Sequence, residues 1–331
     1  TDATWEKFQE FQQGDSDVDG LNIVKSPYLE VAKEYARAEF SLAQLSRDEG
    51  GNLLHPDVAA AFAKYLLDDD SADPEHVYPY LHQYRALKAV RQDGKNLVVC
   101  TGTGSGKTES FLLPLIDAIY RAHVAAGADY DPHIRAMILY PMNALVNDQI
   151  SRLRRLLRYL PKITFGQYIG TTTRKGIGAD VDDALIAQVE GLERMPLEDG
   201  ELGLRPVECL ANEYRTRDQW RAPADILVTN YAMLERLLLV PETKCGFFSK
   251  CWDFVVIDEA HSYSGSVGTE IAWLMRRLEK RLKRNPADAG KKIRFLATSA
   301  TLSEGGDWAD KAQDFASAIF PVDKEIFILF H

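Results

Sequence analysis

Short apolar runs recur along this chain and alternate with longer stretches in which apolar residues return every three or four positions. The runs are continuous, which is typical of strands buried on both faces of a sheet. They lie at residues 96–101, 136–140, 163–168, 225–229, 253–257 and 293–297. Helices are predicted between them, such as 109–120, with a kink at Pro114, and 144–160. This alternation predicts an α/β fold with a doubly wound parallel sheet, in which ligands gather at the carboxyl ends of the strands.

The regions outside this alternation differ in composition. Residues 1–75 are predicted to form an acidic helical N-terminal extension, with helices at 26–45 and 56–67 and a linker at 68–74. Residues 76–331 then form the α/β domain, closed by a helix near 308–320 and a strand near 325–330. An insertion-like segment at 172–224 interrupts this domain, and a short helix is expected near 182–190.

A glycine-rich loop follows the first predicted strand and reads Thr-Gly-Thr-Gly-Ser-Gly-Lys-Thr over residues 101–108. Consecutive glycines let backbone N–H groups converge on an anion, and the next helix adds the positive end of its dipole. The loop departs from the strict phosphate-binding pattern because Thr101 replaces its first glycine, so a structural turn is the alternative. The residues expected to hold a nucleotide are Thr103, Gly104, Ser105, Gly106, Lys107, Thr108 and Glu109.

Lys107 is expected to neutralise β- and γ-phosphate charge, and the Thr108 hydroxyl to ligate Mg²⁺. A second signal, this one acidic, follows the strand at 253–257, where Asp258 and Glu259 are adjacent. Alone, such a pair is usually a helix cap or a solvated turn. Together with the loop it predicts a nucleotide hydrolase, in which Asp258 holds the Mg²⁺ and Glu259 orients or deprotonates the attacking water.

Further segments, in this order, make the chain resemble the superfamily 2 helicases. Residues 80–85 resemble the adenine-reading segment, and residues 138–149 and 168–171 resemble motifs Ia and Ib. Residues 226–230 resemble a further strand-end contact, 258–261 the DEAH form of motif II, and 299–301 motif III. The resemblance implies a RecA-like P-loop NTPase lobe that uses ATP and Mg²⁺. The wording of motif Ia and of residues 229–235 is most similar to large bacterial helicases of repair and phage defence, such as those of Druantia or DISARM systems.

The resemblance also implies roles for individual residues. Gln83 would read the adenine base, and His261 would join the catalytic set of Lys107, Asp258 and Glu259 and couple it to motif III. The coupling residues of motif III would be Ser299 and Thr301. Contacts to the nucleic-acid backbone would come from Pro141, Asn143, Gly170, Thr171, Thr229 and Asn230. The predicted function is the ATP-binding lobe of an ATP-dependent helicase or translocase that couples hydrolysis to tracking along a strand, DNA rather than RNA.

Two other functions stay open at this point. One is a P-loop ATPase of another class, and the other is a degenerate lobe that binds nucleic acid as a scaffold. No counterpart of motifs IV to VI follows Thr301, and the chain opens at Thr1. We therefore expect the front part of a longer protein, in which a second RecA-like lobe, C-terminal domains and defence or repair subunits are partners. Since the second lobe supplies arginines to the γ-phosphate, the chain alone should bind nucleotide with little hydrolysis.

Composition and charge limit how the chain can contact nucleic acid and where in the cell we expect it. The 331 residues carry a net charge of −10, so any contact with nucleic acid must be local. Of two basic helices, at 151–158 and 276–284, the second has its apolar residues at helical spacing and should pack on the sheet with its cations in solvent. Without a signal-peptide pattern or a membrane-length apolar run, we expect a cytoplasmic protein with no membrane partner. Four cysteines without C-x-x-C spacing favour reduced thiols over a zinc site.

Overall fold

The structure is a computed structural model of the chain. It describes residues 35–47, 51–102, 104–170, 212–214, 223–241, 246–263, 265–284, 286–288, 290–300, 308–321 and 326–330. The helix expected near 182–190 and the first part of the helix expected over 26–45 lie outside these ranges. All of the described residues belong to one compact unit, Tyr35–His331.

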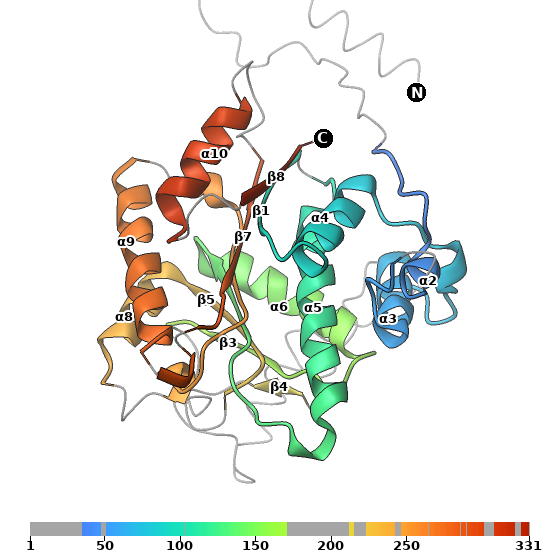
Figure 1. Cartoon of the computed structure of the whole chain (residues 1–331), viewed down its shortest axis with the longest axis horizontal. Coiled ribbons are helices and arrows are strands. Elements are labelled where there is room, and N and C mark those ends of the chain that lie inside the picture. Colours follow the sequence, from blue (N-terminus) through green and yellow to red (C-terminus); the bar gives the residue numbers. More distant parts are fainter. Residues whose placement is uncertain are drawn as a thin grey trace, which may run out of the picture. The chain divides into compact units, whose positions relative to one another are not determined.

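An eight-stranded sheet with the strand order β4-β3-β5-β2-β6-β7-β1-β8 is the centre of this unit (Figure 1). Every neighbouring pair is parallel. The strands are β1 (Asn96–Cys100), β2 (Ala136–Tyr140), β3 (Phe165–Tyr168), β4 (Glu213–Tyr214), β5 (Ile226–Asn230), β6 (Phe254–Ile257), β7 (Arg294–Ser299) and β8 (Ile326–Phe330). The sequence pattern predicted seven of them, and only the two-residue β4 was missed. The doubly wound parallel sheet is therefore confirmed.

Alternate residues of the inner strands β1, β2, β5, β6 and β7 enter two separate hydrophobic cores. In β1, Leu97 and Val99 belong to the first core, whereas Val98 and Cys100 belong to the second. The same alternation holds in β2, where Ile138 faces the first core. Successive side chains of a strand point to opposite faces, so a continuous apolar run is needed when helices cover both faces.

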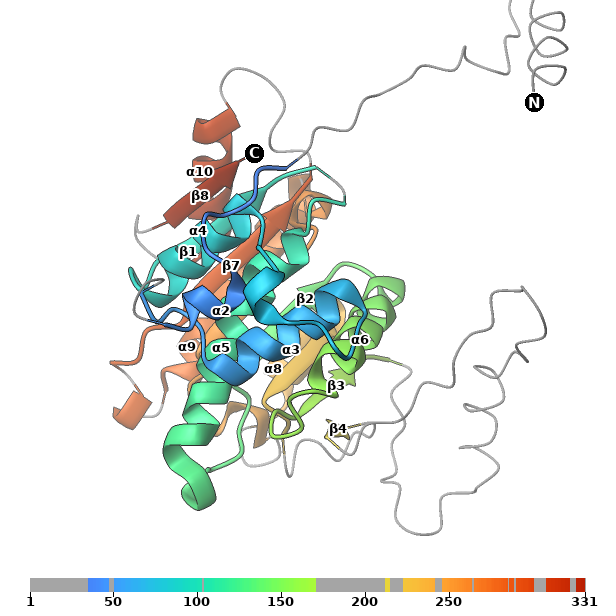
Figure 2. The ribbon, with the colours of Figure 1, turned by 90° about the vertical axis from the view of Figure 1, so that its right-hand side faces the viewer.

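Helices cover both faces of the sheet (Figures 1 and 2). On one face lie α2 (Leu42–Leu45), α3 (Pro56–Leu67), α4 (Leu81–Arg91), α5 (Lys107–Ala126) and α6 (Asn143–Leu157). The other face carries α8 (Tyr231–Leu239), α9 (Gly265–Leu282) and α10 (Trp308–Ile319). Short 3₁₀ turns complete the set: η2 (Pro74–His76), η3 (Gly127–Asp129), η6 (Gly246–Phe248), η7 (Ala260–Ser262) and η8 (Pro286–Asp288).

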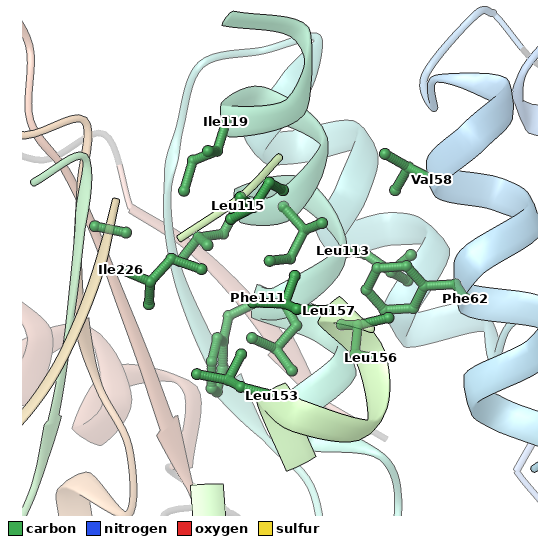
Figure 3. Packing of buried hydrophobic residues seen from close by; sticks show 14 of the residues in the cluster. Val58, Phe62, Phe111, Leu113, Leu115, Ile119, Leu153, Leu156, Leu157 and Ile226 are labelled. Carbon is green, nitrogen blue, oxygen red and sulfur yellow. The ribbon is translucent and has the colours of Figure 1, made fainter. Parts of the chain in front are cut away.

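The described part of the segment before residue 76 packs against the α/β domain. Phe62 of α3 is fully buried and lies among core residues of α5 and α6, such as Leu113 and Leu156 (Figure 3). The acidic stretch 68–74 is a turn within this packing, and Asp68 ends α3 in the left-handed conformation. The compact unit thus starts at Tyr35, because α3 is too apolar on its inner side to stay apart from the core. Of the helix expected over 26–45, the described part is helical only in α2.

Helix α5 runs through Pro114 and is the one described helix whose length and composition would allow a membrane span. Its apolar residues are instead core residues: Phe111, Leu115 and Ile119 are fully buried in the first core (Figure 3). Buried core helices of water-exposed domains pass the same length and hydropathy test. Packing therefore accounts for the apolar composition of α5.

Candidate functional site

The glycine-rich loop and the acidic pair meet at one edge of the sheet. Strand β7 lies between β1 and β6, with Cys100 in register with Ser299 and Ile257 in register with Ala297. The loop that follows β1 and the pair that follows β6 therefore both leave the carboxyl edge, on either side of the end of β7. With strands about 4.8 Å apart, the two strand ends are separated by about 10 Å.

Two glycines of the loop have conformations that other residues rarely adopt. Gly104 has φ +74° and Gly106 has φ +77°. A Cβ atom at Gly106 would also lie 2.5 Å from Nε2 of Gln83. The loop thus needs glycine at position 106 for both backbone conformation and space.

Thr101, which departs from the strict loop pattern, braces the loop from inside. Its side chain is fully buried, and its Oγ1 lies 2.6 Å from Oγ of Ser105, a hydrogen bond. Ser105 in turn donates to the carbonyl oxygen of Gly102 at 2.8 Å. The replacement of glycine by threonine therefore adds a hydrogen bond across the loop.

Lys107 and Thr108 open helix α5 directly after this loop. Lys107 is 7% exposed, and its Nζ has no hydrogen-bond partner among the described residues. The Thr108 hydroxyl accepts a hydrogen bond from Nη1 of Arg152 on α6 at 3.2 Å. Glu109 is held differently, because its Oε1 accepts from the buried Tyr65 hydroxyl at 3.1 Å. A buried, unpartnered ammonium at the end of a glycine loop is suited to an anionic ligand.

Gln83 touches the loop through its amide, which differs from the adenine contact that the resemblance implies. Its Nε2 donates to the carbonyl oxygen of Gly106 at 3.1 Å, and its Oε1 accepts from the backbone N–H of Tyr80 at 2.9 Å. The side chain is 2% exposed. In this structure both ends of the amide bind protein, so Gln83 connects the start of α4 to the loop.

Asp258 is the centre of a buried polar network. Its Oδ2 accepts from the Tyr140 hydroxyl at 2.6 Å, and its Oδ1 accepts from the Thr298 hydroxyl and from the backbone N–H of Glu259. The Tyr140 hydroxyl also lies 2.9 Å from the amide of Gln149 on α6. Burial, and then the negative charge of Asp258, raise the pKa of Tyr140, which keeps this phenol a proton donor.

Sequence reasoning missed Tyr140, Gln149 and Thr298 as parts of the site. Each of them stands within or next to a segment that was recognised, since Tyr140 precedes Pro141 and Thr298 precedes Ser299. Only the packing shows that Tyr140 and Thr298 bond to Asp258 and that Gln149 bonds to Tyr140. Their position beside a motif was the one signal that the sequence offered.

Glu259 and His261 lie together after β6. Glu259 has φ +51°, a left-handed conformation that costs a non-glycine residue energy and is concentrated at functional sites. Nδ1 of His261 lies 3.3 Å from Oε2 of Glu259, and both side chains are 30% exposed. Both residues also line a groove with a volume of about 470 Å³, which extends to Pro141 and Met142. Glu259 and His261 are thus open to a ligand from one side, whereas Asp258 is buried behind them.

The expected nucleic-acid contacts divide into two groups. Asn143 and Gly170 are exposed and Pro141 is half-buried, while Asn230 donates through Nδ2 to Oδ1 of Asn143 at 2.6 Å. The side chain of Thr229 instead faces the protein, and its contact with nucleic acid stays a prediction. Thr229 is fully buried and its hydroxyl donates to the carbonyl oxygen of Tyr168 at 2.6 Å, so it joins β5 to β3.

The remaining predicted positions can be placed only in part. Ser299 is fully buried at the end of β7, and its Oγ has no hydrogen-bond partner among the described residues. Thr103, Thr171 and Thr301 lie outside the described ranges. Of the cysteines, Cys100 and Cys251 are buried free thiols. The described part of the chain has no group of three or more histidine, cysteine, aspartate or glutamate residues placed to hold a metal.

Helix α9 has the amphipathic arrangement that its sequence predicts. Ile271, Leu274, Leu278 and Leu282 are buried in the second core. The basic residues at its end lie on the outer side, where Arg276 and Arg277 are exposed. Because the apolar face of α9 packs on the sheet, its basic side chains are left on the side that faces solvent.

Comparison with known proteins agrees with this geometry. The DEAD/DEAH box helicase family matches residues 80–195 and 199–307, more than half of the chain. The chain therefore belongs to the DEAD/DEAH box helicase family, and it is an ATP-dependent helicase domain with a RecA-like fold.

Two individual proteins are similar to the chain over about two thirds of its length or more. It is similar to the Druantia protein DruE of Escherichia coli (strain UMEA 4076-1), with 33% identity over 309 residues, 71% of this chain and 16% of that protein. It is also similar to the ATP-dependent helicase YprA of Bacillus subtilis (strain 168), with 28% identity over 68% of this chain and 23% of that protein. The chain thus spans less than a quarter of the length of these two relatives.

A solved structure supports the fold. The chain is similar to the DUF1998 helicase MrfA bound to DNA and AMPPNP, with a TM-score of 0.56 and 22% identity. The match covers 90% of this chain and 30% of that one. At this identity the likeness shows a shared lobe architecture.

Proposed function

We propose that this lobe binds ATP with Mg²⁺ and couples its hydrolysis to movement along a nucleic-acid strand, DNA rather than RNA. The observation that carries the proposal is the buried ammonium of Lys107, unpartnered among the described residues and set behind the left-handed glycines of the loop. The glycine-rich loop lies at the same edge of the sheet as Asp258 and Glu259. No scaffold role needs such an arrangement, because an unpaired buried charge destabilises a protein unless a ligand compensates it.

The residues present fit a magnesium–nucleotide complex. Thr108 and Asp258 offer a hydroxyl and a carboxylate, the hard oxygen donors that Mg²⁺ prefers. When bound, the ion would neutralise charge on the phosphates. Lys107 and the loop amides would hold the phosphates, and Tyr140 and Thr298 keep the Asp258 carboxylate oriented. Glu259, partly exposed beside the groove, would orient or deprotonate water, and His261 would link it to Ser299 and Thr301.

Nucleic acid would lie along the carboxyl edge of the sheet. The side chains of Pro141, Asn143 and Asn230 and the backbone at Gly170 would contact phosphates and sugars. Thr171, outside the described residues, is proposed for the same role. The DNA in the MrfA structure supports DNA as the substrate. Because the chain carries a net charge of −10, binding should be weak and should weaken further with salt. Fluorescence anisotropy with single-stranded DNA and RNA of one sequence would test this preference.

The whole protein would do more than this lobe. Since the chain spans 16% of DruE and 30% of MrfA, we propose that a second RecA-like lobe and C-terminal domains complete the motor, with defence or repair subunits as partners in the cytoplasm. Arginines from a second lobe accelerate hydrolysis by roughly 10³ to 10⁵ in related NTPases. This chain alone should therefore bind nucleotide with little turnover, and brisk DNA-stimulated hydrolysis would contradict that.

Replacement of Lys107 tests the assignment of the loop. Lys107→Ala should weaken the binding of a fluorescent ATP analogue at least tenfold, because a charge-assisted hydrogen bond contributes about 1.5–3 kcal/mol. Lys88→Ala, which removes an exposed lysine from α4, is the matched control and should leave the dissociation constant unchanged. Equal affinities of Lys107→Ala and the unaltered chain would remove the proposed function.

A further inference from the structure

Arg152 of α6 reaches across to the residue that we assign to magnesium. Its Nη1 donates to Oγ1 of Thr108 at 3.2 Å and lies 4.0 Å from Oε1 of Glu109. Its positive charge also opposes the rise in the pKa of Tyr65 and of Tyr140. The guanidinium therefore stands beside Thr108 on the side where Tyr140 bonds to Asp258.

The fold does not depend on this contact. The side chain of Arg152 is 44% exposed, and its 4.0 Å approach to Glu109 is at the limit for an ion pair. Glu109 already accepts a hydrogen bond from Tyr65. Exposed pairs of this kind contribute little to stability. A side chain with so much freedom can leave Thr108 by rotation, without movement of α6.

A magnesium ion on Thr108 would compete with this arginine. The ion would need a lone pair of the same hydroxyl oxygen, and a guanidinium keeps its charge at any pH of interest. Two cations on one oxygen would repel each other strongly in a partly buried site. Arg152 and Mg²⁺ therefore exclude one another at Thr108.

We propose that Arg152 is a positioning residue that holds the Thr108 hydroxyl in the nucleotide-free lobe and has to leave it when magnesium enters with the nucleotide. This inference rests on the proposed function, since it takes Thr108 as a magnesium ligand. It assigns to Arg152, on helix α6, an influence on how strongly nucleotide binding depends on magnesium. Arg152 thereby disfavours the magnesium-bound state relative to the magnesium-free one.

The test compares nucleotide affinity with and without magnesium in the full 331-residue chain. Dissociation constants of a fluorescent ATP analogue are measured in excess MgCl₂ and in EDTA, and their ratio gives the gain due to magnesium. Loss of one positive charge by itself weakens the binding of ATP⁴⁻ in EDTA more than that of MgATP²⁻. The ratio is therefore judged against a second variant on α6 that loses the same charge. Arg152→Gln should raise this ratio about fivefold, the equivalent of one ordinary hydrogen bond. The concentration of MgCl₂ that half-saturates the effect should fall by the same factor.

Arg155→Gln is the matched control. Arg155 lies one turn further along α6 with its guanidinium 5.5 Å from the centre of the Tyr65 ring, and its loss changes net charge equally. Its ratio should rise much less than that of Arg152→Gln. A ratio in Arg152→Gln no higher than that in Arg155→Gln would overturn the inference, and a selective loss of affinity in MgCl₂ would show instead that Arg152 binds phosphate. Failure of the unaltered chain to bind nucleotide at all would remove the proposed function itself.

Discussion

Asp225→Asn should weaken the fold while leaving the nucleotide site intact. Asp225 is 1% exposed and precedes β5, at the amino edge of the sheet. Its Oδ2 accepts from the backbone N–H and the hydroxyl of Thr164, both at 2.8 Å, and lies 3.0 Å from Nε2 of His123. Its Oδ1 accepts from the Tyr130 hydroxyl. This carboxylate thus joins β3, β5 and α5.

The size of the effect follows from these bonds. An asparagine keeps the shape but turns one acceptor oxygen into a donor, which opposes at least one of the N–H or O–H groups now facing Asp225. Loss of one or two hydrogen bonds to a charged, buried acceptor costs about 1.5–3 kcal/mol each. We therefore expect the free energy of unfolding to fall by about 3–5 kcal/mol, the usual result of breaking a buried charged network.

The dependence on pH has a defined sign. Burial would raise the pKa of Asp225, but hydrogen bonds from His123, Tyr130 and Thr164 outweigh it and hold the pKa below its ordinary value of 3.8. A depressed folded-state pKa stabilises the protein above the unfolded-state pKa, and that contribution is lost as pH falls through the folded-state value. The difference in the free energy of unfolding between the unaltered chain and Asp225→Asn should hence have its full size at pH 7 and shrink below about pH 4.

Urea unfolding followed by circular dichroism from pH 7 to pH 3 measures this gap. Asp131→Asn is the control, because that carboxylate is 65% exposed and pairs with Lys250 at the surface. Nucleotide affinity at pH 7 should be the same in both variants. Equal urea midpoints for Asp225→Asn and the unaltered chain at pH 7, or a gap that does not change with pH, would refute this account of the amino edge.

Three further changes test other parts of the structure. Phe62→Ala should lower the free energy of unfolding of the whole compact unit by about 3–5 kcal/mol, in a single transition. Leu67→Ala, which changes a residue 57% exposed on the same helix, should leave this free energy unchanged. Two separate unfolding transitions would show an independent extension. Thr101→Gly should lower the melting temperature, because it removes the bond to Ser105 and adds backbone freedom; a higher melting temperature would contradict the bracing role. Burial raises the pKa of the Cys100 thiol to about 12, so in a variant with the other three cysteines changed to serine it should resist a thiol reagent at pH 8 until urea is added.

The strands and the site chemistry could be predicted from local signals. The run Asn96–Cys100 is apolar at every inner position, and a strand buried on both faces allows little else. Lys107, Asp258 and Glu259 stand at strand ends with the residue types that phosphate and Mg²⁺ require. Periodicity and motif order carry this information without any tertiary contact.

What the sequence alone left undecided was which surfaces meet. Nothing in the residues around Phe62 says that α3 packs on α5 and α6, so the sequence divided the chain near residue 75 without saying where the first segment lies. Thr229 and Gln83 were assigned to ligands by their motifs, yet both are satisfied by protein groups. Tyr140 and Arg152 became parts of the site only once helix α6 was placed. A hydrogen bond between residues about a hundred positions apart depends on the packing of whole elements, and that packing is a property of the folded chain as a unit.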